Sequence, residues 1–276
     1  MTCESHSFQP VALSIAGSDS GGGAGIQADL RAFTAFGVFG ATAVTAVTAQ
    51  NPTAVTGVQG VTATILRQQI QAVRAAFAVG AVKIGMLFSA ELITVVADEL
   101  ADWDVPLVID PVMIATSGAR LLPEAAVRAL KERLIPRATL ITPNIPEARA
   151  LTADADADGP RLASQLLDTL GVPVLVKGGH NRADRSTDIL ATPEGIWRLS
   201  SPVIDAPATH GTGCSLSSAC AAALSIHPDT PLIDVVRQGK AYVFGALKHC
   251  ARIGEKTWTM WPAPNLPIAD ISVTRL

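Results

Sequence analysis

The chain has 276 residues, a formal net charge of −3 and a hydrophobic fraction of 49%, which together suit one large α/β domain over residues 1–276. The slightly acidic balance excludes the basic footprint of a protein that binds nucleic acid or an anionic membrane surface. No apolar stretch is long enough to span a bilayer, and the four cysteines lie far apart, as expected in a reducing cytoplasm. The N-terminus lacks a basic n-region, so we expect no secretory signal and a flexible segment over residues 1–10.

Short apolar runs alternate with amphipathic segments, which predicts a mostly parallel sheet covered by helices. In chain order the first half reads as strand Val11–Ala16, helix Ile26–Phe36, strand Ala41–Thr48, helix Thr62–Phe77, strand Val82–Ile84, helix Ala90–Leu100 and strand Leu107–Asp110. The second half reads as helix Glu124–Leu134, strand Thr139–Ile141, helix Arg161–Leu170, strand Val174–Lys177, strands Ser186–Ala191 and Gly195–Ser200 joined by a Thr-Pro-Glu-Gly turn, and helices Ser215–Leu224 and Leu232–Cys250. The pattern does not give the order of strands in the sheet.

A glycine-rich loop, Gly17–Gly25, connects the first strand to the first helix. Glycines let a backbone approach a ligand closely, and a helix N-terminus favours negative charge. A dinucleotide fingerprint is ruled out because no acidic residue between Asp29 and Glu91 could hold a ribose, and a P-loop because the first lysine is Lys83. The loop is therefore a close-approach surface for another ligand or a tight turn alone. Asp29 is either a first-turn acid favoured by the helix dipole or a residue that holds a substrate hydroxyl or amine.

A second glycine-rich turn, Thr209–Cys214, precedes the small-residue helix Ser215–Leu224. Backbone N–H groups at such a turn form an anion hole that can stabilise a transferring phosphoryl group. The helix dipole there favours a Cys214 thiolate, which could accept a proton from an attacking alcohol. Two alternatives stay open: Cys214 is a small buried hydrophobic residue, or it is a nucleophile with His210 as its base, as in thiol hydrolases.

Six motifs occur in a fixed order along the chain: Ile15–Leu30, Lys83–Leu87, Ile109–Met113, Thr142–Glu147, Val176–His180 and Thr209–Cys214. Together they resemble the hydroxymethylpyrimidine and hydroxymethylpyrimidine-phosphate kinases of thiamine biosynthesis, a branch of the ribokinase-like kinases, over about residues 11–247. The resemblance implies a ribokinase-like sheet with helices on both faces, ATP and Mg²⁺, a homodimer, and two successive phosphorylations of one aminopyrimidine. It does not extend to Ile253–Trp261, where Trp258 and Trp261 are expected to cover apolar surface or to lie in a subunit contact.

The resemblance also implies roles for individual residues. Cys214 would be the general base: ribokinase-like kinases usually carry aspartate at this position, and this branch carries cysteine, as the chain does. Gly211, Thr212 and Gly213 would supply the anion-hole amides. Lys177 would contact phosphate. The residues expected near ATP and Mg²⁺ are Asp110, Asn144, Glu147 and Thr209, with Glu147 holding the metal through water. The residues expected to hold the pyrimidine are Gly17, Asp29, Gln50, Met86 and Val112.

Gln50 bears on the choice of substrate. A carboxamide presents a donor and an acceptor, which suits the ring nitrogen and exocyclic amine of an aminopyrimidine, and pyridoxal-kinase-like relatives tend to differ at this position. The simpler interpretations are that Gln50 is a strand-end turn residue, Met86 a core residue and Glu147 a first-turn acid. For the whole chain, a pyridoxal or pyridoxine kinase and a non-catalytic pyrimidine-binding module remain the alternative functions.

Overall fold

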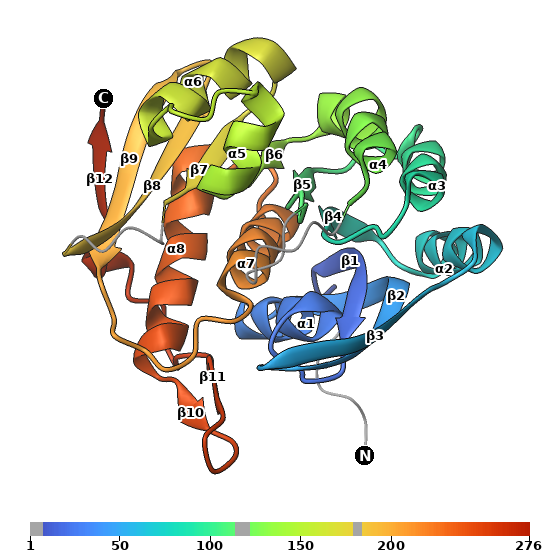
Figure 1. Cartoon of the computed structure of the whole chain (residues 1–276), viewed down its shortest axis with the longest axis horizontal. Helices are drawn as coiled ribbons and strands as arrows, with labels where there is room; N and C mark the ends of the chain where they lie inside the picture. Colours follow the sequence, from blue (N-terminus) through green and yellow to red (C-terminus); the bar gives the residue numbers. More distant parts are fainter. Residues whose placement is uncertain (1–7, 114–121, 179–183) are drawn as a thin grey trace.

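The structure, a computed structural model, describes residues 8–113, 122–178 and 184–276. Within them ten strands form one sheet in the order β12-β9-β8-β7-β6-β5-β4-β1-β2-β3 (Figure 1). The strands are β1 (Val11–Asp19), β2 (Phe39–Asn51), β3 (Ala54–Gly60), β4 (Val79–Ile84), β5 (Leu107–Ile109), β6 (Leu140–Ile141), β7 (Val174–Lys177), β8 (Arg185–Thr192), β9 (Gly195–Pro202) and β12 (Ser272–Arg275). The central strands β2, β1, β4, β5, β6 and β7 pair in parallel, and antiparallel strands extend the sheet at both edges.

Helices cover both faces of this sheet. One face carries α1 (Gly25–Ala35), α7 (Thr212–Ile226) and α8 (Leu232–Lys248), and the other carries α2 (Ala63–Ala76), α3 (Ala90–Leu100), α4 (Glu124–Ala129), α5 (Ile145–Thr152) and α6 (Gly159–Leu170). Successive side chains of a strand point to opposite faces, so Leu13 and Ile15 of β1 pack with α2 and α3, whereas Ala12 packs with α1 and α7. The predicted α/β class with helices on both faces is confirmed.

The elements expected from the sequence are present with small shifts at their ends, and the turn between β8 and β9 is where the Thr-Pro-Glu-Gly pattern predicts it. Two edge strands were not predicted. β3 is exposed along almost all of its length and β12 along all of it, so neither shows the apolar run or the alternation that marks a buried strand. The predicted helix over Glu124–Leu134 is α4 followed by a π-helical turn, Leu130–Leu134.

The C-terminal part departs from expectation. Strands β10 (Ala251–Arg252) and β11 (Trp258–Thr259) form a separate hairpin that projects beyond the end of α8 (Figure 1). Trp258 is 37% exposed and Trp261 54% exposed, so both residues are partly buried, and the expected apolar cover and subunit contact stay predictions. Of the segment expected to be flexible, 1–10, residues 1–7 lie outside the described residues, as does His180 of the fifth motif.

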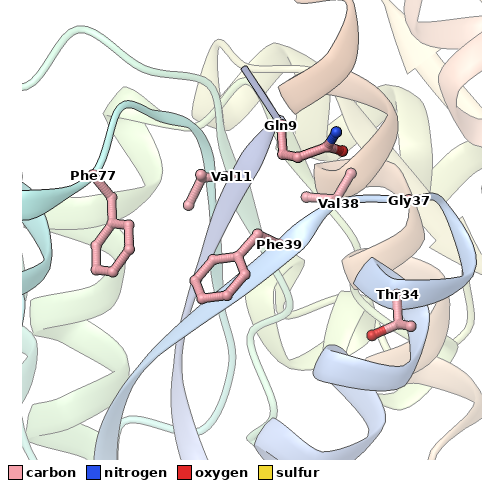
Figure 2. A pocket seen from close by; sticks show the side chains of 7 residues that line it. All are labelled: Gln9, Val11, Thr34, Gly37, Val38, Phe39 and Phe77. Atoms are coloured by element: carbon pink, nitrogen blue, oxygen red, sulfur yellow. The ribbon is translucent and has the colours of Figure 1, made fainter. Parts of the chain in front are cut away.

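The amino and carboxyl edges of the parallel strands differ in chemistry. At the amino edge a shallow apolar hollow lies beside the start of β1, where the rings of Phe39 and Phe77 stack with centroids 5.6 Å apart (Figure 2). At the carboxyl edge, by contrast, polar side chains such as Asp110 and Lys177 line a second cavity. None of the described helices has the length and apolar character needed to cross a membrane.

Candidate active site

A cavity of about 470 Å³ follows the carboxyl ends of the parallel strands. This edge is where open α/β sheets bind ligands, because loops that leave neighbouring strands converge there. Every site residue expected from the sequence borders the cavity except Asp29: Gly17, Gln50, Met86, Asp110, Val112, Asn144, Glu147, Lys177, Thr209, Gly211, Thr212, Gly213 and Cys214. The six motifs, which are far apart in the sequence, therefore converge on one cavity.

Asp29 lies beneath the cavity rather than in its wall. Its side chain is 0% exposed, and both carboxylate oxygens lie 2.8 Å from Lys83 Nζ. The hydroxyl groups of Ser14 and Ser218 donate to the same carboxylate at 2.6 Å. Because protein donors already occupy its oxygens, the expectation that Asp29 holds the substrate is wrong. It is not a first-turn acid either, since α1 begins at Gly25 and has no acid in its first turn.

Two helix N-termini meet at the cavity, and their glycines make this possible. Gly25 opens α1 with φ +57°, and Gly211 precedes α7 with φ +84°, a backbone region that side chains disfavour. A Cβ at Gly25 would overlap the Gly17 carbonyl oxygen, and one at Gly211 would overlap the Gly23 carbonyl oxygen. The two glycine-rich loops are thus in direct backbone contact. The first-turn N–H groups of α7, which lack intrahelical acceptors, begin at this junction, although the Thr212 N–H lies 3.4 Å from the Thr209 carbonyl oxygen.

Cys214 is the third residue of α7. Burial raises the pKa of its thiol; the Lys83 ammonium opposes this effect, whereas Asp29 and Asp110 add to it. The net shift is upward, so the expectation of a thiolate favoured by the helix dipole is wrong. Cys214 is therefore a thiol at neutral pH, with charged groups of both signs around it.

We expect this raised pKa to be visible as slow alkylation of Cys214. The thiolate is the reactive form, so raising the pKa lowers its population at neutral pH, and the rate should still be rising above pH 9, the ordinary value for a cysteine. Iodoacetamide labelling followed by peptide mass spectrometry separates Cys214 from Cys250, which serves as the internal control. A rate for Cys214 that levels off below pH 8 would contradict this electrostatic picture.

A cluster of charged side chains lines the cavity where the neighbouring strands β5, β6 and β7 end. Lys177 Nζ, at the end of β7, lies 2.8 Å from Asp110 Oδ1, next to the end of β5. Burial lowers the pKa of Lys177, but Asp110 and Glu147 more than offset it, so the net shift is upward and the ammonium is retained. Asn144 forms an isolated parallel bridge with Lys177, which fixes the start of α5 against β7.

Asn144 and Glu147 form a capping box at the start of α5. The Asn144 side chain accepts the Glu147 N–H at 2.9 Å, and Glu147 Oε2 accepts the Asn144 N–H at 2.9 Å. Glu147 Oε1 also accepts the Met113 N–H at 3.1 Å, next to Val112, whose φ of +30° is unusual for a β-branched residue. The capping role expected of a first-turn acid is therefore present, and it holds the carboxylate at the cavity wall.

The carboxylates of this cluster fit a hard divalent cation. Burial raises the pKa of Glu147; Lys177 opposes the rise, and the nearby Asp110 carboxylate adds to it. Two carboxylates that repel one another in a buried site, each with lone pairs left after its hydrogen bonds, are the oxygen donors that Mg²⁺ prefers. Asp110 and Glu147 would hold the ion, Glu147 through water.

Glu147→Gln is expected to lower Mg²⁺-dependent turnover by about tenfold, because an outer-sphere carboxylate that orients a metal typically contributes this much. Urea denaturation of the variant would show whether losing part of the capping box also reduces stability. An unchanged rate with an unchanged Mg²⁺ dependence would remove Glu147 from the metal site.

Three further polar pairs border or support the cavity, and the sequence predicted none of these pairings. Lys83 lies between Asp29 and the cavity. Lys240 of α8 contacts Asp188 of β8 with Nζ 2.6 Å from Oδ2, and His210 contacts Asp19. Lys240 sits in the middle of an amphipathic helix, where a lysine usually faces solvent, so only the tertiary contact identifies it. Lys83, by contrast, is a lysine in the otherwise apolar strand β4, and this pattern could have identified it as a buried residue in need of a partner.

A mostly parallel sheet with helices on both faces, and a cavity at its carboxyl edge lined by a helix start, a lysine and two carboxylates, is the ribokinase-like arrangement that the sequence predicts. Comparison with known proteins specifies the class further. The profile described as phosphomethylpyrimidine kinase matches residues 19–261, and the chain belongs to this family.

Individual relatives agree with this assignment. The hydroxymethylpyrimidine/phosphomethylpyrimidine kinase of Rhizobium meliloti is 46% identical over 247 residues, which cover 88% of this chain and 92% of the relative. The phosphomethylpyrimidine kinase of Clostridium difficile has a similar structure, with a TM-score of 0.74 and 38% identity over 86% of this chain and 98% of that one. The pyridoxal kinase of Staphylococcus aureus in complex with AMP-PCP and pyridoxal has a TM-score of 0.84 and 25% identity over 98% of this chain and 100% of that one.

Proposed function

We propose that this chain is an ATP-dependent kinase that phosphorylates 4-amino-5-hydroxymethyl-2-methylpyrimidine and then its monophosphate, giving the pyrimidine diphosphate for thiamine biosynthesis. The observation that carries the proposal is that one cavity brings these residues together. Gln50, at the end of β2, and Lys177, at the end of β7, line the same cavity although four strands separate β2 from β7 in the sheet, and Cys214 lines it at the start of α7. The names of the family and of its 46% identical relative favour the pyrimidine over pyridoxal.

The chain's own residues would divide the work of phosphoryl transfer. The first-turn N–H groups of α7, at Gly211, Thr212 and Gly213, would stabilise charge on the transferring group. Lys177 would contact the phosphates of ATP, near Thr209, and Cys214 would accept the proton of the attacking hydroxyl. Mg²⁺ bound near Asp110 and Glu147 would neutralise phosphate charge. The structural neighbour that contains AMP-PCP, an ATP analogue, supports ATP as the co-substrate.

The decisive test is a mass-spectrometric assay with ATP, Mg²⁺ and hydroxymethylpyrimidine. We expect both the monophosphate and the diphosphate, with the monophosphate also accepted when supplied directly. Parallel reactions with pyridoxal and pyridoxine decide between the two vitamer classes, and a reaction with EDTA tests the metal. Tight binding of the pyrimidine in calorimetry without any turnover would instead support a non-catalytic binding module.

Gln50→Met should raise the KM for the aminopyrimidine by about 5- to 150-fold, because a buried heterocycle edge without its hydrogen-bond partner costs about 1–3 kcal/mol. The KM for ATP should stay close to the parent value, since Lys177, proposed to contact its phosphates, ends β7, and four strands lie between β7 and β2 in the sheet. Steady-state kinetics with each substrate varied in turn measures the split. Equal losses for both substrates would indicate a folding defect, and no loss would remove Gln50 from the site.

We further propose that residues 1–276 form a single kinase domain that acts as a homodimer in the cytoplasm. One sheet runs through the described residues from β12 to β3, and the free thiols of Cys214, Cys220 and Cys250 suit a reducing compartment. At the β3 edge, Val55 and Val58 are exposed and also border the cavity. A second copy would cover this unpaired apolar edge. A single-chain mass in light scattering would contradict the dimer.

A further inference from the structure

His210 connects the two glycine-rich loops through one nitrogen atom. Its Nε2 lies 3.1 Å from Asp19 Oδ2, in the first loop, and 3.1 Å from the carboxamide nitrogen of Gln50, at the end of β2. The ring also packs on Gly23, where a Cβ would collide with it. His210 is therefore fixed between the turn that precedes the anion hole and the residue expected to hold the pyrimidine.

The Asp19 contact determines which nitrogen of His210 carries hydrogen. Burial raises the pKa of Asp19, but hydrogen bonds from Ala24, His210 and Gly21 outweigh it, so the net shift is downward and Asp19 is an ionised, acceptor-only group at neutral pH. An acceptor 3.1 Å away requires Nε2 to donate. This holds for the neutral ring, in its Nε2–H tautomer, and for the imidazolium.

The Nε2–H group in turn determines the orientation of the Gln50 carboxamide. With its nitrogen toward His210, Gln50 would place two donors face to face. In that orientation the carboxamide oxygen faces the Thr48 hydroxyl at 3.3 Å and needs a donor. The single proton of this hydroxyl is already donated to the Ser18 carbonyl oxygen at 2.9 Å. Turning the carboxamide by 180° removes both conflicts: its oxygen shares the single Nε2–H of His210 with Asp19 in a bifurcated hydrogen bond, and its nitrogen donates to Thr48. The oxygen and nitrogen of an amide are distinguished by their hydrogen-bond partners.

We propose that His210 is a positioning residue that fixes this orientation of Gln50, and so fixes the order in which the pocket presents an acceptor and a donor to the substrate ring. One lone pair and one N–H of the carboxamide remain after its contacts with His210 and Thr48. A ring with an acceptor nitrogen next to an exocyclic amine matches this pair in one in-plane orientation only. The inference rests on the proposed function, and it adds that the Asp19–His210–Gln50 chain selects how the aminopyrimidine lies relative to Cys214.

Steady-state kinetics of three variants tests the effect on the substrate. His210→Leu removes the donor and should raise the KM for the aminopyrimidine by about tenfold, with the KM for ATP unchanged. His210→Gln retains a side-chain N–H and should recover most of the loss. His227→Gln, at an exposed position after α7, is the matched control and should behave as the parent. Equal rises for both substrates in His210→Leu, or no rise, would overturn the inference.

Nitrogen-15 NMR tests the same inference without turnover. The histidine resonances that disappear in His210→Gln identify His210, and its neutral form should be the Nε2–H tautomer across a pH titration. A neutral Nδ1–H tautomer overturns the positioning role whatever the activity. The expected tautomer in a protein that does not phosphorylate the pyrimidine would refute the proposed function and leave the hydrogen-bond chain intact.

Discussion

Replacing Cys214 with alanine is expected to lower kcat by about 10²–10⁴-fold, the usual contribution of a positioned general base. ATP binding should survive, because the anion-hole amides at Gly211, Thr212 and Gly213 belong to the backbone. The raised pKa of the thiol implies that the base must become effective within the complex, so the loss should appear in kcat rather than in the KM for ATP. Cys250→Ala, which changes a cysteine outside the cavity, is the matched control.

The same position separates the kinase from a thiol hydrolase. A general base needs no covalent intermediate, so Cys214→Asp should retain measurable activity. A nucleophilic cysteine would form an adduct that can be trapped, and aspartate could hardly replace it. We expect intact-protein mass spectrometry to find no acyl- or phospho-cysteine during turnover. An adduct at Cys214, or full activity in Cys214→Ala, would overturn the mechanism.

Replacing Lys83 with methionine is expected to destabilise the protein by about 3–5 kcal/mol, the usual cost of leaving one partner of a buried ion pair alone. Both side chains of the Lys83–Asp29 pair are 0% exposed. Burial lowers the pKa of Lys83, but Asp29, Cys214 and Asp110 together raise it above its usual value. The stability that the pair contributes is therefore present below the ordinary lysine pKa and is lost as the pH rises through the folded value.

A double variant distinguishes charge pairing from packing. Lys83→Met together with Asp29→Asn removes both charges, so it should be more stable than Lys83→Met alone, despite carrying one more substitution. Urea denaturation of the parent, the two single variants and the double variant gives the coupling energy. Losses that simply add would show that the two side chains contribute packing and not a coupled pair.

Most of the site could be predicted because its residues follow the ends of apolar strands. Lys177 ends β7, Gln50 lies near the end of β2, and Asp110 directly follows β5. In a parallel sheet these positions share one edge, so the motif order along the chain indicates a single site without knowledge of the strand order. The Asn144–Glu147 spacing likewise indicates a helix start.

The failures have a common physical cause. The pattern of a sequence reports the period of burial, and it does not report which side chain pairs with which. Asp29 looked available because nothing in the sequence showed Lys83 from β4 reaching its carboxylate. The Cys214 thiolate was expected from the helix dipole alone, whereas burial among Lys83, Asp29 and Asp110 decides the direction of the shift.

The backbone contact between Gly211 and the Gly23 carbonyl has a consequence for how such enzymes can diversify. The turn proposed to hold the phosphoryl group is placed against the first glycine-rich loop by main-chain atoms in van der Waals contact. Substitutions at Gln50, Met86 or Val112 would change the side chains around the substrate and leave this main-chain contact in place. The substrate could then change through single substitutions around the ring, while the contact between the two glycine-rich loops is retained.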